Sequence, residues 1–187
     1  PCRSVVMNRD EDWESIIRFK DGDLAAFTEL VERYEGVVFN CAFRIVGDRE
    51  DAADVAQSVF LKLYQYLETV DTSRSFFSWL YRVAVNEAID HTRKRRPHDT
   101  LDESAIASST DNPVHHLDRD ERDRALQRAL DRLSDEQRAV VVLRHFSQLS
   151  YREVSEVLEI PETQVKSRLY AARQRLRELL IAAGEGY

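Results

Sequence analysis

Apolar residues recur three or four positions apart along most of this chain, whereas glycine and proline, the residues that punctuate turns, are rare. The 187 residues contain only five glycines and four prolines. An all-β fold needs many turns, so this scarcity together with the helical spacing favours helices. We therefore expect an all-α protein without internal repeats.

The polar segment 97–117 divides the helical pattern into two parts. It contains two of the four prolines and neither lysine nor arginine, which is typical of an extended acidic linker. Residues 12–96 and 118–183 are expected to form two small helical domains on either side. Residues 1–11 are expected to be a tail, and the six residues that precede Met7, the only methionine, are expected to be partly an addition to the native start.

The composition argues against several classes of function. The longest uninterrupted apolar runs, such as 139–143, are much shorter than the roughly 20 residues of a membrane-spanning helix. Cys2 and Cys41 match no metal spacing and no disulfide framework, which fits a reducing cytoplasm. The five histidines form no metal motif, and no P-loop, nucleophile elbow or paired-carboxylate signature occurs. We expect a cytoplasmic protein that is not an enzyme, holds no cofactor or metal and does not insert into a membrane.

The segment 150–177, SYREVSEVLEIPETQVKSRLYAARQRLR, has the pattern of a helix-turn-helix. Ser150 followed by Glu153 is a capping box that opens a short helix, and a turn at 159–161 leads into a longer helix that ends near residue 180. Ser134 followed by Gln137 is a second capping box, which opens the preceding helix.

The longer helix of this motif separates apolar from polar residues. Between 163 and 177 it carries five basic residues and no acidic one, although the whole chain has a net charge of −7. Small polar residues can approach base edges in a DNA groove while flanking cations contact the phosphates. We interpret this face as a duplex-binding surface, and the alternative is a solvated basic helix face.

A polar loop at 71–75 is followed by four aromatic residues within six positions and then by a basic helix end at 93–96. Clustered aromatic residues usually belong to a core. Aromatic side chains beside a polar loop also stack unpaired bases, which contributes roughly 1–3 kcal/mol per base. The residues alone leave both interpretations open.

The segment 48–67 is expected to be a helix, because acidic residues at 48–51 suit a helix N-terminus and an apolar stripe follows at helical spacing. A second face combines Asp54, Gln57 and Leu61. This mixed face is either a docking surface or the site of a partly exposed leucine without consequence.

These segments together resemble one protein family. LSDEQRAVVVLRHFSQLSYREVSEVLEIPETQVKSRLYAARQRLR, residues 133–177, resembles region 4, the promoter −35-binding domain, of the extracytoplasmic-function (ECF) sigma factors of bacterial RNA polymerase. DREDAADVAQSVFLKLYQYL resembles their region 2.2, and SFFSWLYRVAVNEAIDHTRKRR resembles regions 2.3 and 2.4. The similarity extends over about residues 12–180 and keeps the order of the regions.

The resemblance implies a dissociable subunit that binds core RNA polymerase at the β′ clamp and the β flap, directs it to promoter DNA and is restrained by an anti-sigma factor. The residues implied in binding the β′ clamp are Asp51, Asp54, Gln57, Phe60 and Leu61. Those implied in opening and reading the −10 element are Ser73, Arg74, Phe76, Phe77, Trp79, Arg82, Asn86, Asp90 and Arg93. Those implied in reading the −35 element are Thr163, Gln164, Lys166, Ser167, Arg168, Tyr170 and Arg173.

The chain departs from the family pattern at a few positions. The family favours glycine where this chain has Gln148 and Glu159, and an acidic residue where it has Ser58. If Glu159 adopts the positive φ that glycine would allow, the strain costs on the order of 1 kcal/mol. Thr163 and Gln164 also replace the usual Gly-Thr pair where the helix enters the groove.

Two other functions are compatible with parts of the sequence. A stand-alone helix-turn-helix regulator with an N-terminal sensing domain would explain residues 134–180 but not 71–96, and a protein-interaction scaffold would show no dependence on DNA. For a sigma factor, a 21-residue linker spans up to about 70 Å. The two promoter elements lie roughly 50 Å apart, so both are within reach.

Overall fold

The computed structural model describes residues 9–67, 75–95 and 117–184, with the backbone alone at 9, 10 and 117–120. The predicted linker therefore lies outside the described residues except for Leu117. The elements are α1 Arg9–Lys20, α2 Leu24–Val46, α3 Arg49–Tyr66, α4 Phe76–Arg95, α5 Leu117–Asp131, α6 Asp135–Val141, the π-helix η2 Val142–Phe146, α7 Tyr151–Leu158 and α8 Glu162–Ala182. No strand occurs in these ranges, and the all-α prediction is confirmed.

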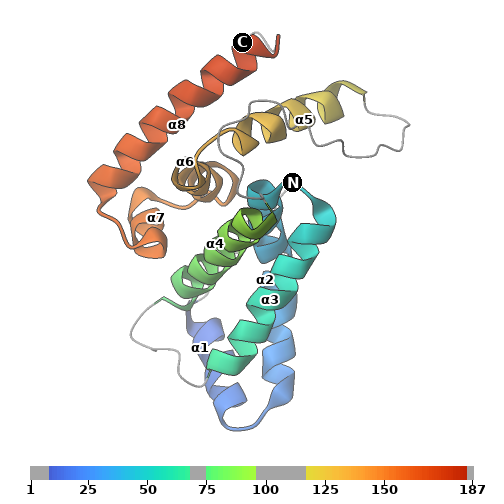
Figure 1. Cartoon of the computed structure of the whole chain (residues 1–187). Helices are drawn as coiled ribbons and strands as arrows, with labels where there is room; N and C mark the ends of the chain where they lie inside the picture. The colour runs from blue at the N-terminus through green and yellow to red at the C-terminus, as the bar shows by residue number, and fades with distance from the viewer. Residues whose placement is uncertain (1–8, 68–74, 96–116, 185–187) are drawn as a thin grey trace.

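Helices α1 to α4 form the first domain, in which α2 and α3 run side by side (Figure 1). Helix α2 continues through Gly36 and ends at Gly47, whose φ of 83° is the left-handed conformation that glycine adopts without strain. The Asp48 side chain then accepts hydrogen bonds from the first backbone amides of α3. The predicted apolar stripe of this helix is buried and consists of Ala52, Ala56, Val59, Leu63 and Leu67.

Helices α5 to α8 form the second domain. Both predicted capping boxes are present: Ser134 with Gln137 opens α6, and Ser150 with Glu153 opens α7. The predicted helix after Ser134 changes from α-helical to π-helical at Val142, a local widening that the apolar spacing did not indicate. None of the helices in the described part of the chain is long and apolar enough to cross a bilayer.

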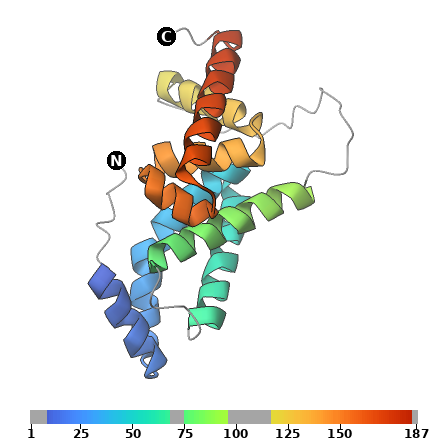
Figure 2. The ribbon, with the colours of Figure 1, turned by 90° about the vertical axis from the view of Figure 1, so that its left-hand side faces the viewer.

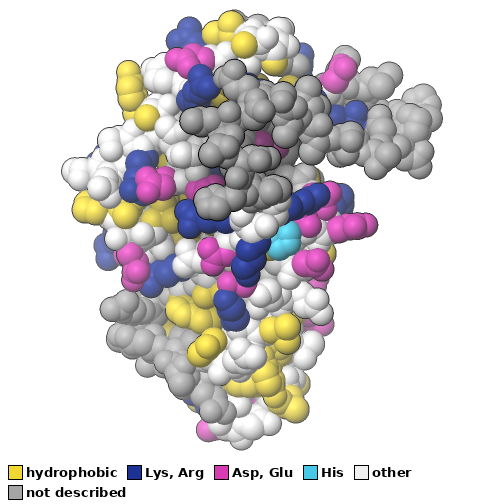
Figure 3. Space-filling view, viewed as in Figure 1, with side chains coloured by type: hydrophobic (Ala, Val, Ile, Leu, Met, Phe, Trp, Pro, Cys, Tyr) yellow, Lys and Arg dark blue, Asp and Glu magenta, His cyan; other side chains and the backbone are white. Residues whose placement is uncertain are grey.

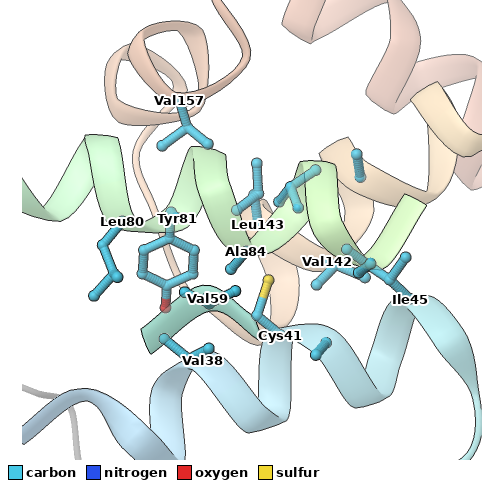
Figure 4. Packing of buried hydrophobic residues seen from close by; sticks show 14 of the residues in the cluster. Val38, Cys41, Ile45, Val59, Leu80, Tyr81, Ala84, Val142, Leu143 and Val157 are labelled. Atoms are coloured by element: carbon cyan, nitrogen blue, oxygen red, sulfur yellow. The ribbon is translucent and has the colours of Figure 1, made fainter. Parts of the chain in front are cut away.

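The two domains are not separate bodies but share one apolar core. Val142, Leu143 and Val157 of the second domain belong to the same buried cluster as Cys41 of α2 and Tyr81 of α4. Figure 4 shows Val142 near Ile45 of α2, and Val157 on the side of α4 that faces away from Cys41. Burial raises the pKa of the Cys41 thiol to about 12, which keeps it protonated. Figures 1 and 2 both show α7 against α4. The first domain therefore positions the helix-turn-helix directly.

A buried arginine connects the two domains by hydrogen bonds. Arg138 of α6 is only 1% exposed, and its guanidinium donates to the carbonyl oxygens of Ile45 at 2.7 Å and Leu130 at 3.0 Å. It also donates to those of Asp131 at 3.1 Å and Leu133 at 3.2 Å. Carbonyls at a helix C-terminus lack intrahelical partners. Arg138 supplies donors to the ends of both α2 and α5, and thereby connects the two domains.

Candidate polymerase and nucleic-acid interfaces

Helix α8 presents the predicted polar face to solvent. Its apolar stripe is anchored by Val165, Leu169 and Ala172, which are buried. The side chains on the opposite side are exposed, and they are Thr163, Gln164, Lys166, Ser167, Tyr170, Arg173, Gln174 and Arg177. The face predicted from spacing is therefore available to a duplex. Arg168 differs from the other candidates, because it is half-buried and forms a 3.0 Å ion pair with Glu136 of α6.

The basic surface extends from α8 onto the preceding elements. His145 of η2 accepts from the Arg173 guanidinium, with 3.2 Å between Nε2 and Nε and 3.1 Å between Nε2 and Nη2. Burial, together with the charges of Arg173 and Arg144, lowers the pKa of His145 below its ordinary value. The centroid of the Tyr151 ring lies 5.2 Å from Arg144 Cζ and 5.5 Å from Lys166 Nζ. No local pattern indicates a role for His145, Arg144 or Tyr151, because their proximity to α8 is purely tertiary.

Helix α3 exposes an apolar residue flanked by polar ones. Leu61 is 57% exposed, and Asp54 and Gln57 on the same face are exposed as well. Phe60 is half-buried against the core. Figure 3 shows hydrophobic side chains at the surface over the part of the molecule where α2 and α3 lie. Such a mixed, accessible face is typical of a docking surface.

Asp51 lies apart from this docking face. It is half-buried, forms an ion pair with Arg95 of α4 and lies 3.8 Å from His91. Its contacts connect α3 to α4 within the first domain. Asp51 therefore helps to hold the fold together, whereas Asp54, Gln57 and Leu61 are exposed and available to a partner.

Ser58, which stands where the family favours an acidic residue, has a local partner. Its hydroxyl donates to Glu87 of α4 at 2.6 Å, and Lys62 forms an ion pair with the same carboxylate. Burial opposes the charged form of Glu87, but the hydrogen bonds from Lys62 and Ser58 outweigh it and hold the pKa of Glu87 below its ordinary value.

The aromatic residues at the start of α4 belong mainly to the core. Phe76 and Phe77 are buried and contact the ring of Tyr34 at centroid distances of 5.6 and 6.4 Å. Tyr81 is also buried, whereas Trp79 is half-buried. The sequence left open whether these aromatic residues belong to the core or stack on bases, and the structure places Phe76 and Phe77 in the core. Ser73 and Arg74, the other predicted residues of this segment, lie outside the described residues.

The polar residues of α4 fall into two groups. Asn86 and Asp90 are exposed. Arg82 instead donates to Glu159 Oε1 at 2.6 Å and to two carbonyl oxygens of α7, and Arg93 donates to Asp135 Oδ2 at 2.9 Å. The four residues thus divide according to whether the second domain contacts them.

Glu159 also bears on the predicted turn. It has φ 54°, as predicted for a position where the family favours glycine, and Gln148, the other such position, has φ 57°. Non-glycine residues in this left-handed region of backbone conformation cost about 1–2 kcal/mol each.

The described residues include no group of three or more His, Cys, Asp or Glu side chains that could hold a metal.

Comparison with known proteins places this geometry in a family. Sigma-70 region 2 matches residues 30–98, and Sigma-70, region 4, matches residues 123–176. The ECF RNA polymerase sigma factor SigW of Bacillus subtilis is 32% identical over 176 residues, which cover 88% of this chain and 94% of SigW. The chain belongs to the ECF sigma factors.

A second curated relative and two solved structures are also similar to this sigma factor. The RNA polymerase sigma-H factor of Pseudomonas aeruginosa is 30% identical over 186 residues, covering 94% of this chain and 96% of that protein. CnrH, solved in complex with the cytosolic domain of CnrY, superposes with a TM-score of 0.71 at 28% identity over 92% of this chain and 99% of CnrH. The sigma factor RpoE of Bartonella quintana, solved with the anti-sigma factor NepR, shares the fold with a TM-score of 0.62 at 23% identity over 82% of this chain and 96% of RpoE.

The family decides between the functions that the sequence left open. The predicted membership of the ECF sigma factors is confirmed, and it is favoured over a stand-alone helix-turn-helix regulator. A sigma factor uses both matched regions, which explains why the segment 71–96 accompanies the helix-turn-helix.

Proposed function

We propose that this sigma factor binds core RNA polymerase through α3, opens and reads the −10 element with α4 and the segment before it, and reads the −35 element with α8. The observation that carries the proposal is the exposed polar and basic face of α8, held on a helix-turn-helix by a buried stripe on its other side. The proposal keeps the domain limits 12–96, 97–117 and 118–183.

The polymerase contact is assigned to the face of α3 that contains Asp54, Gln57, Phe60 and Leu61. A central exposed leucine supplies apolar area, and the polar residues beside it supply orientation and specificity. Asp51 supports this face indirectly through its ion pair with Arg95. The resemblance to the family implies that this surface docks on the β′ clamp and that the protein also contacts the β flap.

The −10 contact is assigned to α4. Asn86 and Asp90 are exposed at the middle of the helix, and Arg82 and Arg93 supply cations on the same face. Trp79 is the aromatic residue with the accessible ring, whereas Phe76 and Phe77 hold the start of the helix. A base swung out of the duplex would be bound beside the 71–77 segment, which includes Ser73 and Arg74.

The −35 contact is assigned to α8, with Thr163, Gln164, Ser167 and Tyr170 facing the bases. Lys166 and Arg173 contact the phosphates on one side of the groove, and Arg168 lies on the other side. Arg168 reaches phosphate only by leaving Glu136. Base contacts carry the sequence preference, whereas phosphate contacts set register and affinity.

The proposal also covers where the protein acts and what restrains it. The protein acts in the cytoplasm as a non-enzymatic initiation factor, since the chemistry of RNA synthesis belongs to the polymerase. An anti-sigma protein binds and restrains it, as the anti-sigma factor NepR is bound to the sigma factor RpoE in one of the solved complexes.

The proposal is tested by run-off transcription with core RNA polymerase on a randomised promoter library. We expect transcripts that depend on this protein and on two conserved upstream elements, and a library transcribed equally well without it would refute the proposal. In the same assay Leu61→Arg should abolish polymerase binding. Ile17→Arg, a matched control at an apolar residue of α1 that is 55% exposed, should leave it intact. Equal behaviour of the two variants would refute the α3 assignment.

A further inference from the structure

A histidine of η2 lies against the basic face of α8. His145 Nε2 is 3.2 Å from Arg173 Nε and 3.1 Å from Arg173 Nη2, although 28 positions separate the two residues in the sequence. Both side chains are exposed. The contact therefore lies on the surface that the proposed function assigns to DNA, and a ligand from solvent can reach it.

The contact fixes the protonation state of His145. A guanidinium only donates hydrogen bonds, so Nε2 of His145 must offer its lone pair to Arg173, and the proton of the neutral ring is assigned to Nδ1. Nε and Nη2 form one edge of the guanidinium, and such an edge binds the oxygens of carboxylates and phosphates. In the free protein His145 thus occupies the place of an anionic oxygen.

Further cations gather around this contact. Arg144 precedes His145 in η2, and Arg144 and Lys166 of α8 both lie against the ring of Tyr151 of α7. Burial, together with the charges of Arg173 and Arg144, lowers the pKa of His145. A neutral ring is therefore the favoured form while no anion is bound.

Helices α2 and α6 also contact η2. From α2, the Arg44 guanidinium carbon lies 4.6 Å from the ring centroid of Phe146, the residue after His145. From α6, Glu136 is paired with Arg168 of α8 at 3.0 Å, so its charge is balanced by that ion pair. The field at His145 therefore favours an anion beside the ring.

We propose that His145 and Arg173 together bind one phosphate of the DNA duplex, and that His145 takes up a proton as the phosphate binds. The inference rests on the proposed function, since it takes α8 as the DNA contact. The Nε2 lone pair accepts a proton from solvent, and the new N–H donates to a phosphate oxygen. Protonated His145 no longer accepts from Arg173, so the same step frees the guanidinium edge for the phosphate.

Proton uptake makes the affinity for DNA depend on pH. The pKa of His145 lies below its ordinary value in the free protein, whereas a phosphate beside the ring favours the charged form and raises the pKa. Between these two pKa values the complex holds more protons than the free protein, so binding becomes tighter as the pH falls. The gain is at most about tenfold per pH unit, because a single proton is taken up.

Fluorescence anisotropy of the full-length protein with a labelled 20-base-pair duplex tests this coupling. The duplex carries the upstream element selected by run-off transcription. From pH 8 to pH 6 the affinity of the parent should rise about two- to fivefold more than that of His145→Gln, the range for one exposed ion pair. Glutamine still accepts from Arg173 but does not titrate. His91→Gln, which removes a histidine of the first domain, should keep the profile of the parent. Parallel profiles for the parent and His145→Gln would overturn the inference.

Two more variants separate the possible causes. His145→Lys carries a permanent charge, so it should bind more tightly than the parent at pH 8, with a salt slope larger by about 0.9 and no comparable gain at pH 6. Weaker binding by His145→Lys and His145→Gln at every pH would mean that His145 only orients Arg173, against the inference. Arg173→Ala at pH 8 tests the proposed function by itself. If that variant binds as the parent does, the assigned phosphate contact is wrong and the inference falls with it.

NMR of the imidazole nitrogens measures the proton directly. At a pH between the two pKa values, adding the unlabelled duplex should move the Nε2 signal of His145 from the unprotonated to the protonated position, and the spectrum of His145→Gln assigns this signal. The signal of His91 serves as the control and should stay where it is. An Nε2 that remains unprotonated at pH 6 with the duplex bound would refute proton uptake.

Discussion

Arg82 of α4 and Glu159 of the turn between α7 and α8 form a 2.6 Å ion pair that connects the two domains. Glu159 adopts a left-handed backbone conformation that an ordinary side chain reaches only at a cost. Its carboxylate is partly exposed, and an ion pair of this kind contributes only about 0.2–1 kcal/mol. The strain and the ion pair therefore have similar size and opposite sign.

Replacing Gln148 by glycine should raise the free energy of unfolding by about 0.5–1 kcal/mol, because relief of the backbone strain outweighs the added freedom of the unfolded chain. Glu159→Gly should give a smaller gain, since it also removes the ion pair with Arg82. Urea unfolding measures both. In an Arg82→Gln background the gain from Glu159→Gly should rise to that of Gln148→Gly. Equal gains in both backgrounds would show that the pair contributes nothing.

Arg138→Met should destabilise the protein by about 3 kcal/mol or more, because four carbonyl oxygens lose a donor in the shared core. Arg132→Met is the control: Arg132 is exposed, and its loss should change the free energy of unfolding by no more than about 0.5 kcal/mol. Thermal and urea unfolding give the comparison. A small effect at both positions would show that the hydrogen bonds of Arg138 do not connect the two domains as described.

Arg173→Ala should weaken binding to a −35 duplex and reduce the slope of log K against log salt by about 0.9, the value for one phosphate contact. Lys20→Ala removes the same charge from α1 in the other domain and should leave the slope unchanged. Fluorescence anisotropy over a range of salt concentrations measures both. A slope that Arg173→Ala does not alter would exclude a phosphate contact at this position.

His145 should make the stability of the free protein depend on pH. Its pKa is lower in the folded protein than the ordinary value of 6.5, so the unfolded chain binds this proton first as the pH falls. Its contribution is therefore destabilising below about pH 6.5 and vanishes above it. His145→Gln should flatten the loss of stability between pH 7 and pH 5 and leave stability at pH 8 nearly unchanged. Parallel pH profiles for the two proteins would contradict this.

Asn86→Ala should impair opening at the −10 element while binding to core polymerase survives, because Asn86 is exposed on α4 and does not contact the core. Permanganate footprinting of the promoter measures opening, and co-purification measures binding. Glu35→Ala, at an exposed residue of α2, is the control. Loss of both activities with an intact fold would mean that Asn86 supports the structure instead.

The helices and their ends could be predicted because they rest on local rules. The capping boxes at Ser134 and Ser150 and the polar face of α8 depend on residues within a few positions of one another. Burial of Phe76 and Phe77 could not be predicted, since the same aromatic pattern serves a core and a stacking surface. The buried Arg138 was not recognised, because arginine in a sequence ordinarily indicates surface.

The sequence by itself determined the helices, the helix-turn-helix and the charge on α8, because each is encoded by the spacing and the caps of neighbouring residues. Only the tertiary structure decided that Val142, Leu143 and Val157 complete a core shared with α2 and α4. It also decided that Arg82 and Arg93 are held by the second domain. The physical reason is that an apolar stripe or a cation specifies the kind of partner it needs but not which distant segment supplies it.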